Sequence, residues 1–142
     1  MSESPDSSPT PSAAEAEILQ IVWDREPVSV RIVHEEILKS RDVGYTTILK
    51  QLQRMLDKGL VDRTPGAGKS FNYIATRPAA ETRTTLLDRL TRSVFGNSTN
   101  DLVMHALGRG EVSSEDFRQI KKFINELEAE RGTDEGDEND GE

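Results

Sequence analysis

The polar side chains of residues 45–58 are the ones in this sequence best suited to contact a ligand. At about 100° per residue of an α-helix, every apolar side chain of this segment falls on one side. The opposite side carries Thr46, Thr47, Lys50, Gln51, Gln53, Arg54, Asp57 and Lys58. Hydroxyl, amide and guanidinium groups hydrogen-bond base edges in the DNA major groove, and Lys and Arg also neutralise phosphates. The segment is a candidate DNA-reading helix, although any amphipathic surface helix has a polar outer face.

The formal net charge of −8 hides a basic region. Residues 1–12 carry −2 and residues 132–142 carry −6, so the two ends hold most of the excess acid. Residues 41–77 instead contain seven Lys and Arg against three Asp. This local excess of positive charge indicates an anionic partner. The acidic end is typical of a solvated tail, or it competes with DNA for the basic region.

Residues that do covalent or metal chemistry are sparse. The chain has no cysteine, which excludes a thiolate metal site and a cysteine nucleophile. His34 and His105 have no second ligand at metal-binding spacing, so we interpret them as packed or surface residues. Gly66–Ser70 superficially matches a phosphate-binding loop, but Arg63 stands where the first glycine of that motif belongs. We expect no enzyme, no metal and no cofactor.

Local signals divide residues 12–77 into helices and a hairpin. Ser12 and Glu15 form a capping-box pattern, and Gly59 is typical of a helix end. The expected elements are a helix at 13–24, a second helix capped by Ser29, a third at 45–58, and strands at 60–64 and 71–75 around a turn at 65–70. This order is typical of a winged helix-turn-helix whose third helix is the recognition helix.

Basic and polar residues on both sides of the third helix extend the candidate surface. A recognition helix at 45–58 would enter the major groove, with the turn at 65–70 near the DNA backbone. The predicted DNA-binding residues are Arg41, Thr46, Thr47, Lys50, Gln51, Arg54, Lys69 and Ser70.

Residues 78–131 predict three further helices with narrow apolar stripes. Such stripes enclose little core within one subunit, so we expect them to meet a second chain; packing back on residues 12–77 is the alternative. The predicted dimerisation residues are Leu86, Leu90, Leu102, Phe117, Ile120, Ile124 and Leu127. The fold class is therefore mainly α, a winged helix-turn-helix of three helices plus a small β-hairpin, followed by a three-helix dimerisation subdomain.

The composition of the two ends of the chain predicts disorder there. Residues 1–11 are rich in Ser and Pro, and residues 132–142 in Gly, Asp and Glu, so neither can offset its conformational entropy by burying apolar surface. The sequence shows no signal-peptide pattern and no apolar run of about 20 residues. We expect a cytoplasmic protein that does not bind membranes.

Four segments also carry a family resemblance. AEILQIVW at 16–23, VSVRIV at 28–33, YTTILKQLQRMLDKG at 45–59 and LVDRTPGAGKSFNY at 60–73 resemble the penicillinase-repressor family of bacterial transcription regulators, the BlaI/MecI type. The resemblance covers about residues 13–125. It implies a homodimeric repressor on an inverted-repeat operator, with a membrane-bound sensor protease as a further partner.

Two departures limit that resemblance. The β-lactam-responsive members are cleaved at an Asn-Phe bond, and His105-Ala106 occupies that place here, which argues against induction by that proteolysis. The copper-responsive branch has a C-terminal cysteine cluster that this chain lacks. Operator, regulated genes and inducing signal stay open. Two other functions also stay open: a winged-helix protein-interaction module, and a regulator that holds a small effector between its subdomains.

Overall fold

The structure, a computed structural model, describes residues 9–139 of the 142-residue chain, with side chains described through residue 132. The chain forms two compact units, residues 1–90 and residues 91–142. Most of the predicted head at 1–11 lies outside the described residues, as do residues 140–142 of the predicted tail.

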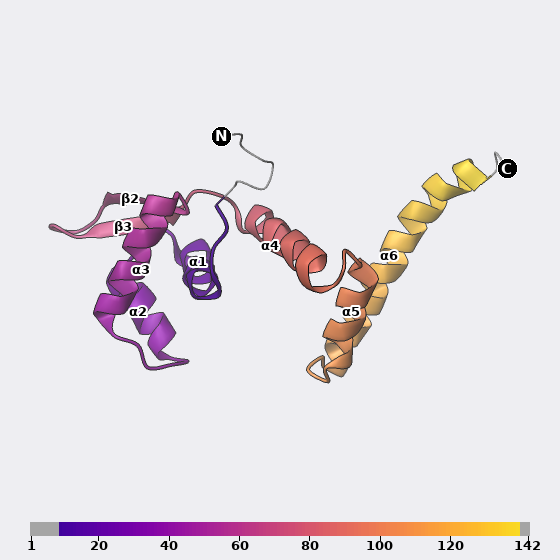
Figure 1. Cartoon of the computed structure of the whole chain (residues 1–142), viewed down its shortest axis with the longest axis horizontal. Helices are drawn as coiled ribbons and strands as arrows, with labels where there is room; N and C mark the ends of the chain where they lie inside the picture. Colours follow the sequence, from indigo (N-terminus) through magenta and orange to yellow (C-terminus); the bar gives the residue numbers. More distant parts are fainter. Residues whose placement is uncertain (1–8, 140–142) are drawn as a thin grey trace. The chain divides into compact units, whose positions relative to one another are not determined.

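The first unit has the winged helix-turn-helix architecture that the sequence predicts. Its elements are α1 (Ala13–Arg25), β1 (Val28–Ser29), α2 (Val30–Leu38), α3 (Tyr45–Lys58), β2 (Val61–Pro65), β3 (Phe71–Ala75) and the first turns of α4 (Ala79–Val94). The strands form an antiparallel sheet in the order β1-β3-β2. Figure 1 shows the β2–β3 hairpin of this sheet. In the β2–β3 hairpin, Val61 lies opposite Ala75 and Pro65 opposite Phe71. We call this hairpin with its turn, residues 61–75, the wing.

One hydrophobic core joins the three helices to the base of the wing. Its buried side chains are Ile18, Leu19, Val22, Val28, Val30, Val33, Ile37, Ile48, Leu52, Met55, Leu60, Val61 and Tyr73. Helix α3 contributes Ile48, Leu52 and Met55, which are fully buried. It ends at Gly59, whose left-handed backbone (φ 81°) reverses the chain into β2. The core thereby fixes which face of α3 meets solvent.

The capping box predicted at the start of α1 is present and has a third member. The Glu15 backbone N–H donates to Ser12 Oγ (3.2 Å), and the Ser12 N–H donates to Glu15 Oε1 (2.9 Å). Lys58, the last residue of α3, donates from Nζ to the same Oε1 at 2.6 Å. Burial by itself raises the pKa of Glu15, but the hydrogen bonds from Lys58 and Ser12 and the charge of Lys58 lower that pKa below its usual 4.5. This carboxylate ties the start of α1 to the end of α3.

Replacing Glu15 by Gln is expected to destabilise the first unit in a pH-dependent way. Gln keeps the capping geometry but loses the charged bond to Lys58, which costs about 1–2 kcal/mol of unfolding free energy at pH 7. A lowered folded-state pKa adds stability above the unfolded value, and that stability is lost as pH falls through the folded value. Urea unfolding of both proteins, followed by Trp23 fluorescence, should therefore show a gap at pH 7 that closes below about pH 4.

Glu35→Gln is the matched control. Glu35 is exposed on α2 and pairs with Arg31 one helical turn away (3.1 Å), an arrangement worth about 0.3–0.5 kcal/mol. An equal loss in both variants at pH 7, or a Glu15 gap that does not change with pH, would contradict the assigned role of Glu15.

The first turns of α4 pack on α1. Trp23 Nε1 donates to the Arg77 carbonyl oxygen (3.0 Å), and Arg83 Nη2 donates to Gln20 Oε1 (3.0 Å). The Arg83 guanidinium also lies over the Trp23 ring, 5.6 Å from its centroid. The first unit extends to Leu90, so these turns of α4 belong to it, and the contacts of Arg77 and Arg83 with α1 lie within that unit.

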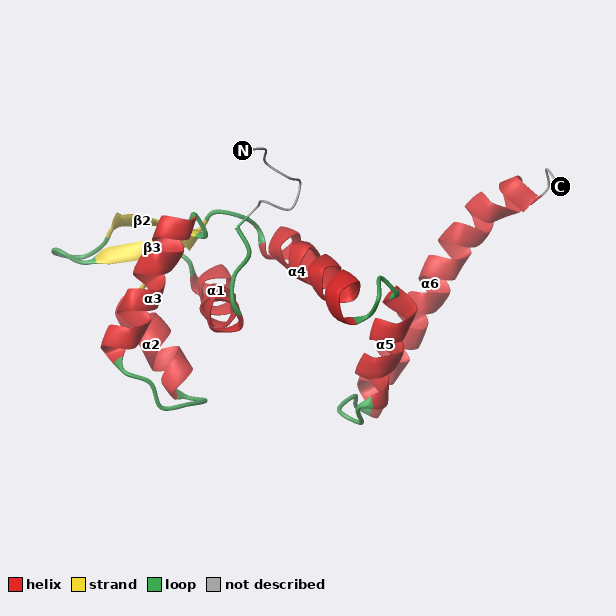
Figure 2. Cartoon of the chain, viewed as in Figure 1, coloured by secondary structure: helices red, strands yellow, loops and turns green. Residues whose placement is uncertain are grey.

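In the part of the second unit that the structure describes, residues 91–139, the elements are helices joined by loops (Figure 2). It comprises the end of α4, α5 (Thr99–Gly108) and α6 (Ser114–Asn139). Ser98 and Ser113 cap α5 and α6, each accepting a backbone N–H with its hydroxyl at 3.1 and 3.0 Å. Within the described residues no helix is long and apolar enough to cross a membrane.

Helix α6 continues beyond the point at which the sequence predicted disorder. The backbone of residues 132–139 is helical and continues α6. Adding a residue to an existing helix forms one hydrogen bond for each residue ordered and needs no new nucleation. The helix that starts at Ser114 therefore propagates through glycine and acidic residues that could not start one.

Candidate nucleic-acid interface

Four polar side chains on the outer face of α3 are exposed and have no side-chain partner within the described residues. They are Thr46, Thr47, Lys50 and Arg54. Among the described residues, no hydrogen bond or ion pair engages the Lys50 or Arg54 side chain. Two cations and two hydroxyls are therefore free to contact a ligand without first breaking a contact of their own.

A short connection positions the first turn of α3. His34 Nε2 of α2 donates to the carbonyl oxygen of Val43 (2.7 Å), and the His34 ring meets Tyr45 edge-on at 5.8 Å. The N-cap of α3 is Gly44, which has no side chain to accept a backbone N–H, whereas Ser12 and Ser29 cap α1 and α2. The first N–H groups of α3 are left to solvent or to an anion.

Two of the predicted DNA-binding residues are less available. Arg41 donates to Glu17 Oε1 from Nη2 (2.8 Å) and from Nε (3.3 Å), so its charge is partly neutralised by α1. Gln51 is half-buried, and its Oε1 is buried without a hydrogen-bond partner in the described part of the chain. The helical wheel alone placed Gln51 at the edge of the polar arc and could not show which way its amide turns.

The wing carries the other two predicted residues at its exposed turn. The Gly66 N–H donates to the Ser70 carbonyl (2.9 Å), and Ser70 Oγ donates to the Ala67 carbonyl (2.6 Å), which closes the turn. Lys69 and Ser70 are both exposed there. The structure thus brings a basic turn and a basic helix face into the same unit.

One arginine of the wing, Arg63, makes a cation–π contact that the sequence did not indicate. The Arg63 guanidinium lies 4.1 Å from the centroid of the Phe71 ring, and both side chains are exposed. The two residues belong to adjacent strands of the hairpin. The predicted pairing of the two strands could have indicated this contact, but the sequence alone did not mark Phe71 as an exposed residue.

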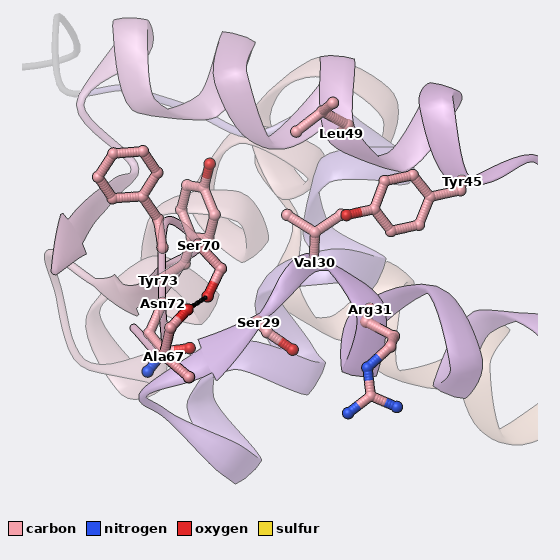
Figure 3. Close-up of a pocket in the computed structure, with 10 residues that line it drawn as sticks. Ser29, Val30, Arg31, Tyr45, Leu49, Ala67, Ser70, Asn72 and Tyr73 are labelled. Carbon is pink, nitrogen blue, oxygen red and sulfur yellow. Dashed lines mark hydrogen bonds between the residues drawn. The ribbon is translucent and has the colours of Figure 1, made fainter. Parts of the chain in front are cut away.

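A pocket of about 620 Å³ lies between α3 and the wing. Tyr45 and Leu49 of α3 line it on one side, Val30 and Arg31 of α2 below, and Ser70, Asn72 and Tyr73 on the wing side (Figure 3). Ser29, Ala67 and Phe71 complete the lining. No motif in the sequence indicated this pocket.

Comparison with known proteins identifies the family. The family model described as "Penicillinase repressor" matches residues 11–126, which span both units. The chain belongs to the penicillinase repressor family. This confirms the resemblance read from the recognition-helix and wing motifs.

Named relatives of this penicillinase-repressor chain are methicillin-resistance and BlaI regulators. The Methicillin resistance regulatory protein MecI of Mammaliicoccus sciuri is 25% identical over 114 residues, covering 80% of this chain and 92% of that protein. The Transcriptional regulator BlaI of Mycobacterium tuberculosis is 29% identical over 120 residues, covering 83% of this chain and 85% of that protein. Among solved structures, the DNA-binding domain of the repressor BlaI matches with 24% identity and a TM-score of 0.46, covering 52% of this chain and 89% of that domain.

The two histidines of this penicillinase-repressor chain are engaged within their own units. His34 holds the turn before α3, as described above, and the His105 ring lies 5.8 Å from that of Phe95. Within the described residues, no three His, Asp or Glu side chains are grouped so as to hold a metal ion. His105 and Ala106 lie inside helix α5, and both are exposed.

Proposed function

We propose that this chain is a homodimeric transcriptional repressor that binds an inverted-repeat operator. Helix α3 enters the major groove, and the wing turn at 65–70 lies near the DNA backbone. The observation that carries the proposal is the exposed, unpaired set of Thr46, Thr47, Lys50 and Arg54 on a helix whose other face is fixed in the core. Its membership in a family of repressors supports a regulatory rather than an enzymatic role.

The second unit supports the dimer part of the proposal. Within the described residues, none of its hydrophobic side chains is buried, and Val94, Met104 and Phe123 are 65%, 64% and 59% exposed. Phe117, Ile120, Ile124 and Leu127 follow a heptad spacing along α6, as predicted, and all four are at least partly accessible. Helices without a buried core are marginal in water, so these stripes need a partner surface.

The dimer fixes the geometry of the operator. Two symmetric recognition helices reach one face of the duplex when the half-sites are about 10 base pairs, one helical turn, apart or a multiple of that. If each subunit neutralises about four phosphates, affinity should fall with salt at a log–log slope of roughly −7.

Selection of random duplex DNA on the full-length protein, read out by sequencing, tests the proposal. We expect an enriched inverted repeat, a solution mass of twice 15.8 kDa, and the salt slope given above. A folded dimer that enriches no duplex would overturn the DNA-binding assignment and favour a winged-helix protein-interaction module. Enrichment of a sequence without an inverted repeat, bound by a monomer, would contradict the proposed twofold symmetry of the complex.

We further propose that release from DNA does not use cleavage at the family's Asn-Phe position. His105-Ala106 stands at that place, within a regular turn of α5. A protease needs an extended backbone, so cutting there would require α5 to unfold locally. A sensor protease specific for the Asn-Phe pair is therefore not proposed as a partner.

A further inference from the structure

The pocket between α3 and the wing has the composition of a small-molecule site. Its volume of about 620 Å³ lies within the range of about 300–1,000 Å³ that is usual for ligand pockets. Three aromatic side chains line it, Tyr45, Phe71 and Tyr73, and two of these are about half exposed, at 46% and 43%. Val30 and Leu49 add aliphatic surface. A flat apolar ligand can therefore contact rings on both the helix and the wing.

The charge of the lining selects an anion. Arg31 is the one ionised side chain among the lining residues, and no carboxylate lies among them. Its guanidinium is exposed and turned toward Glu35 Oε2 at 3.1 Å. An exposed pair within one helix is worth only about 0.3–0.5 kcal/mol, so Arg31 can exchange this partner for a ligand carboxylate that it binds in a bidentate manner. Asn72 adds an amide on the wing side, whereas the Ser70 hydroxyl donates to the Ala67 carbonyl.

We propose that this pocket binds a planar aromatic carboxylic acid, with its ring between Tyr45 and Phe71 and its carboxylate on Arg31. This inference rests on the proposed DNA-binding function for its regulatory meaning only. Ser70, which is part of the wing turn assigned to the DNA backbone, also lines the pocket. A bound anion therefore lies beside the turn assigned to DNA and repels phosphates nearby, so ligand and operator compete.

Titration of the full-length protein with 2-naphthoate, followed by amide NMR shifts, tests the site without DNA. We expect the largest shifts at Tyr45, Leu49 and residues 70–73. The neutral isostere 2-naphthamide should bind at least tenfold more weakly, because it cannot make the charged bond to Arg31. Shifts that do not centre on the pocket, or equal affinity for the acid and the amide, would overturn the proposal.

Arg31→Met isolates the contribution of the charge. We expect it to weaken 2-naphthoate binding about tenfold and to leave 2-naphthamide binding unchanged. Arg118→Met is the matched control, because Arg118 is also exposed and pairs with a carboxylate on its own helix (Glu115, 2.8 Å). Unchanged thermal melts of both variants by Trp23 fluorescence establish that folding is intact. Equal effects of the two substitutions would contradict the assignment of Arg31.

Ala67→Phe tests occupancy independently of charge. Ala67 lines the pocket from the wing turn and is exposed, so a larger side chain there fills the mouth without entering the core. We expect this variant to lose the naphthoate-induced shifts. Retention of full naphthoate affinity by this variant would place the ligand elsewhere.

Operator competition separates failure of the site from failure of the proposed function. At 2-naphthoate concentrations of ten times its Kd, the operator Kd of the wild type should rise roughly 100-fold, about tenfold for each of the two subunits, and that of Ala67→Phe should not change with the probe. If the probe binds the pocket but no duplex is bound, the repressor function is wrong and the site stands. If DNA binds, the probe does not, and Arg31→Met alone weakens DNA binding, the groove belongs to the DNA backbone and the site proposal is wrong.

Discussion

Ile124→Glu is expected to convert the proposed dimer into a 15.8 kDa monomer and to weaken operator binding by roughly 100- to 10,000-fold. Ile124 lies at the centre of the heptad spacing on α6 and is 43% exposed within its own chain. A carboxylate there would be buried without a counter-ion in each half of a symmetric interface. Once the subunits separate, binding of one recognition helix no longer holds a second one at high effective concentration near the other half-site. Light scattering and operator titration of the same sample measure both effects.

Gln119→Glu introduces the same side chain on the same helix but off the heptad spacing. Gln119 is exposed, and we expect its variant to remain a dimer with operator affinity close to that of the wild type. Loss of the dimer in both variants would show that charge on α6, rather than the predicted seam, governs association. A dimeric Ile124→Glu protein would place the interface on another surface.

Arg54→Ala is the second change with a large expected effect. Arg54 is exposed on the outer face of α3, so its truncation leaves the core intact. Loss of a cationic DNA contact costs about 1–3 kcal/mol in each subunit, which weakens a dimer by at least roughly 30-fold. If Arg54 contacts phosphate, the salt slope also falls by about two, one for each subunit, and all operator sequences are affected alike. If it contacts a base, the slope changes less and preference relaxes at one position of each half-site.

Arg118→Ala removes the same charge from the second unit. Arg118 pairs with Glu115 at the start of α6, outside the proposed DNA surface, and its loss should change operator affinity less than twofold. Equal losses for Arg54→Ala and Arg118→Ala would show that net charge alone drives binding. In that case α3 would have no special role in contacting DNA.

The local elements of the first unit were predictable because their signals are short-range. The Ser12–Glu15 capping box, the Ser29 cap and Gly59 at the end of α3 each act through hydrogen bonds or backbone angles within a few residues. The 3.6-residue period of α3 likewise placed Ile48, Leu52 and Met55 in the core before any packing was known. The same period placed Thr46, Thr47, Lys50 and Arg54 on the opposite face, which was therefore expected to be exposed.

Composition alone did not indicate that α6 extends into residues 132–139, because composition does not take into account the helix that precedes a segment. Residues 132–139 could not form a helix alone, yet they extend one that begins at Ser114. The packing of α4 on α1 is another case, because the contacts of Arg83 with Trp23 and Gln20 join residues about 60 positions apart.

The sequence by itself determined the order of the elements and the polar face of α3, because these depend on residues that are neighbours in the chain. It also determined the family, because the family is recognised by sequence motifs. Tertiary structure alone decided which polar groups remain available. It pairs Arg41 with Glu17, turns the Gln51 amide inward, and places Lys58 on Glu15. It also created the pocket between α3 and the wing, whose lining comes from segments that are separated in sequence and meet only when the core packs.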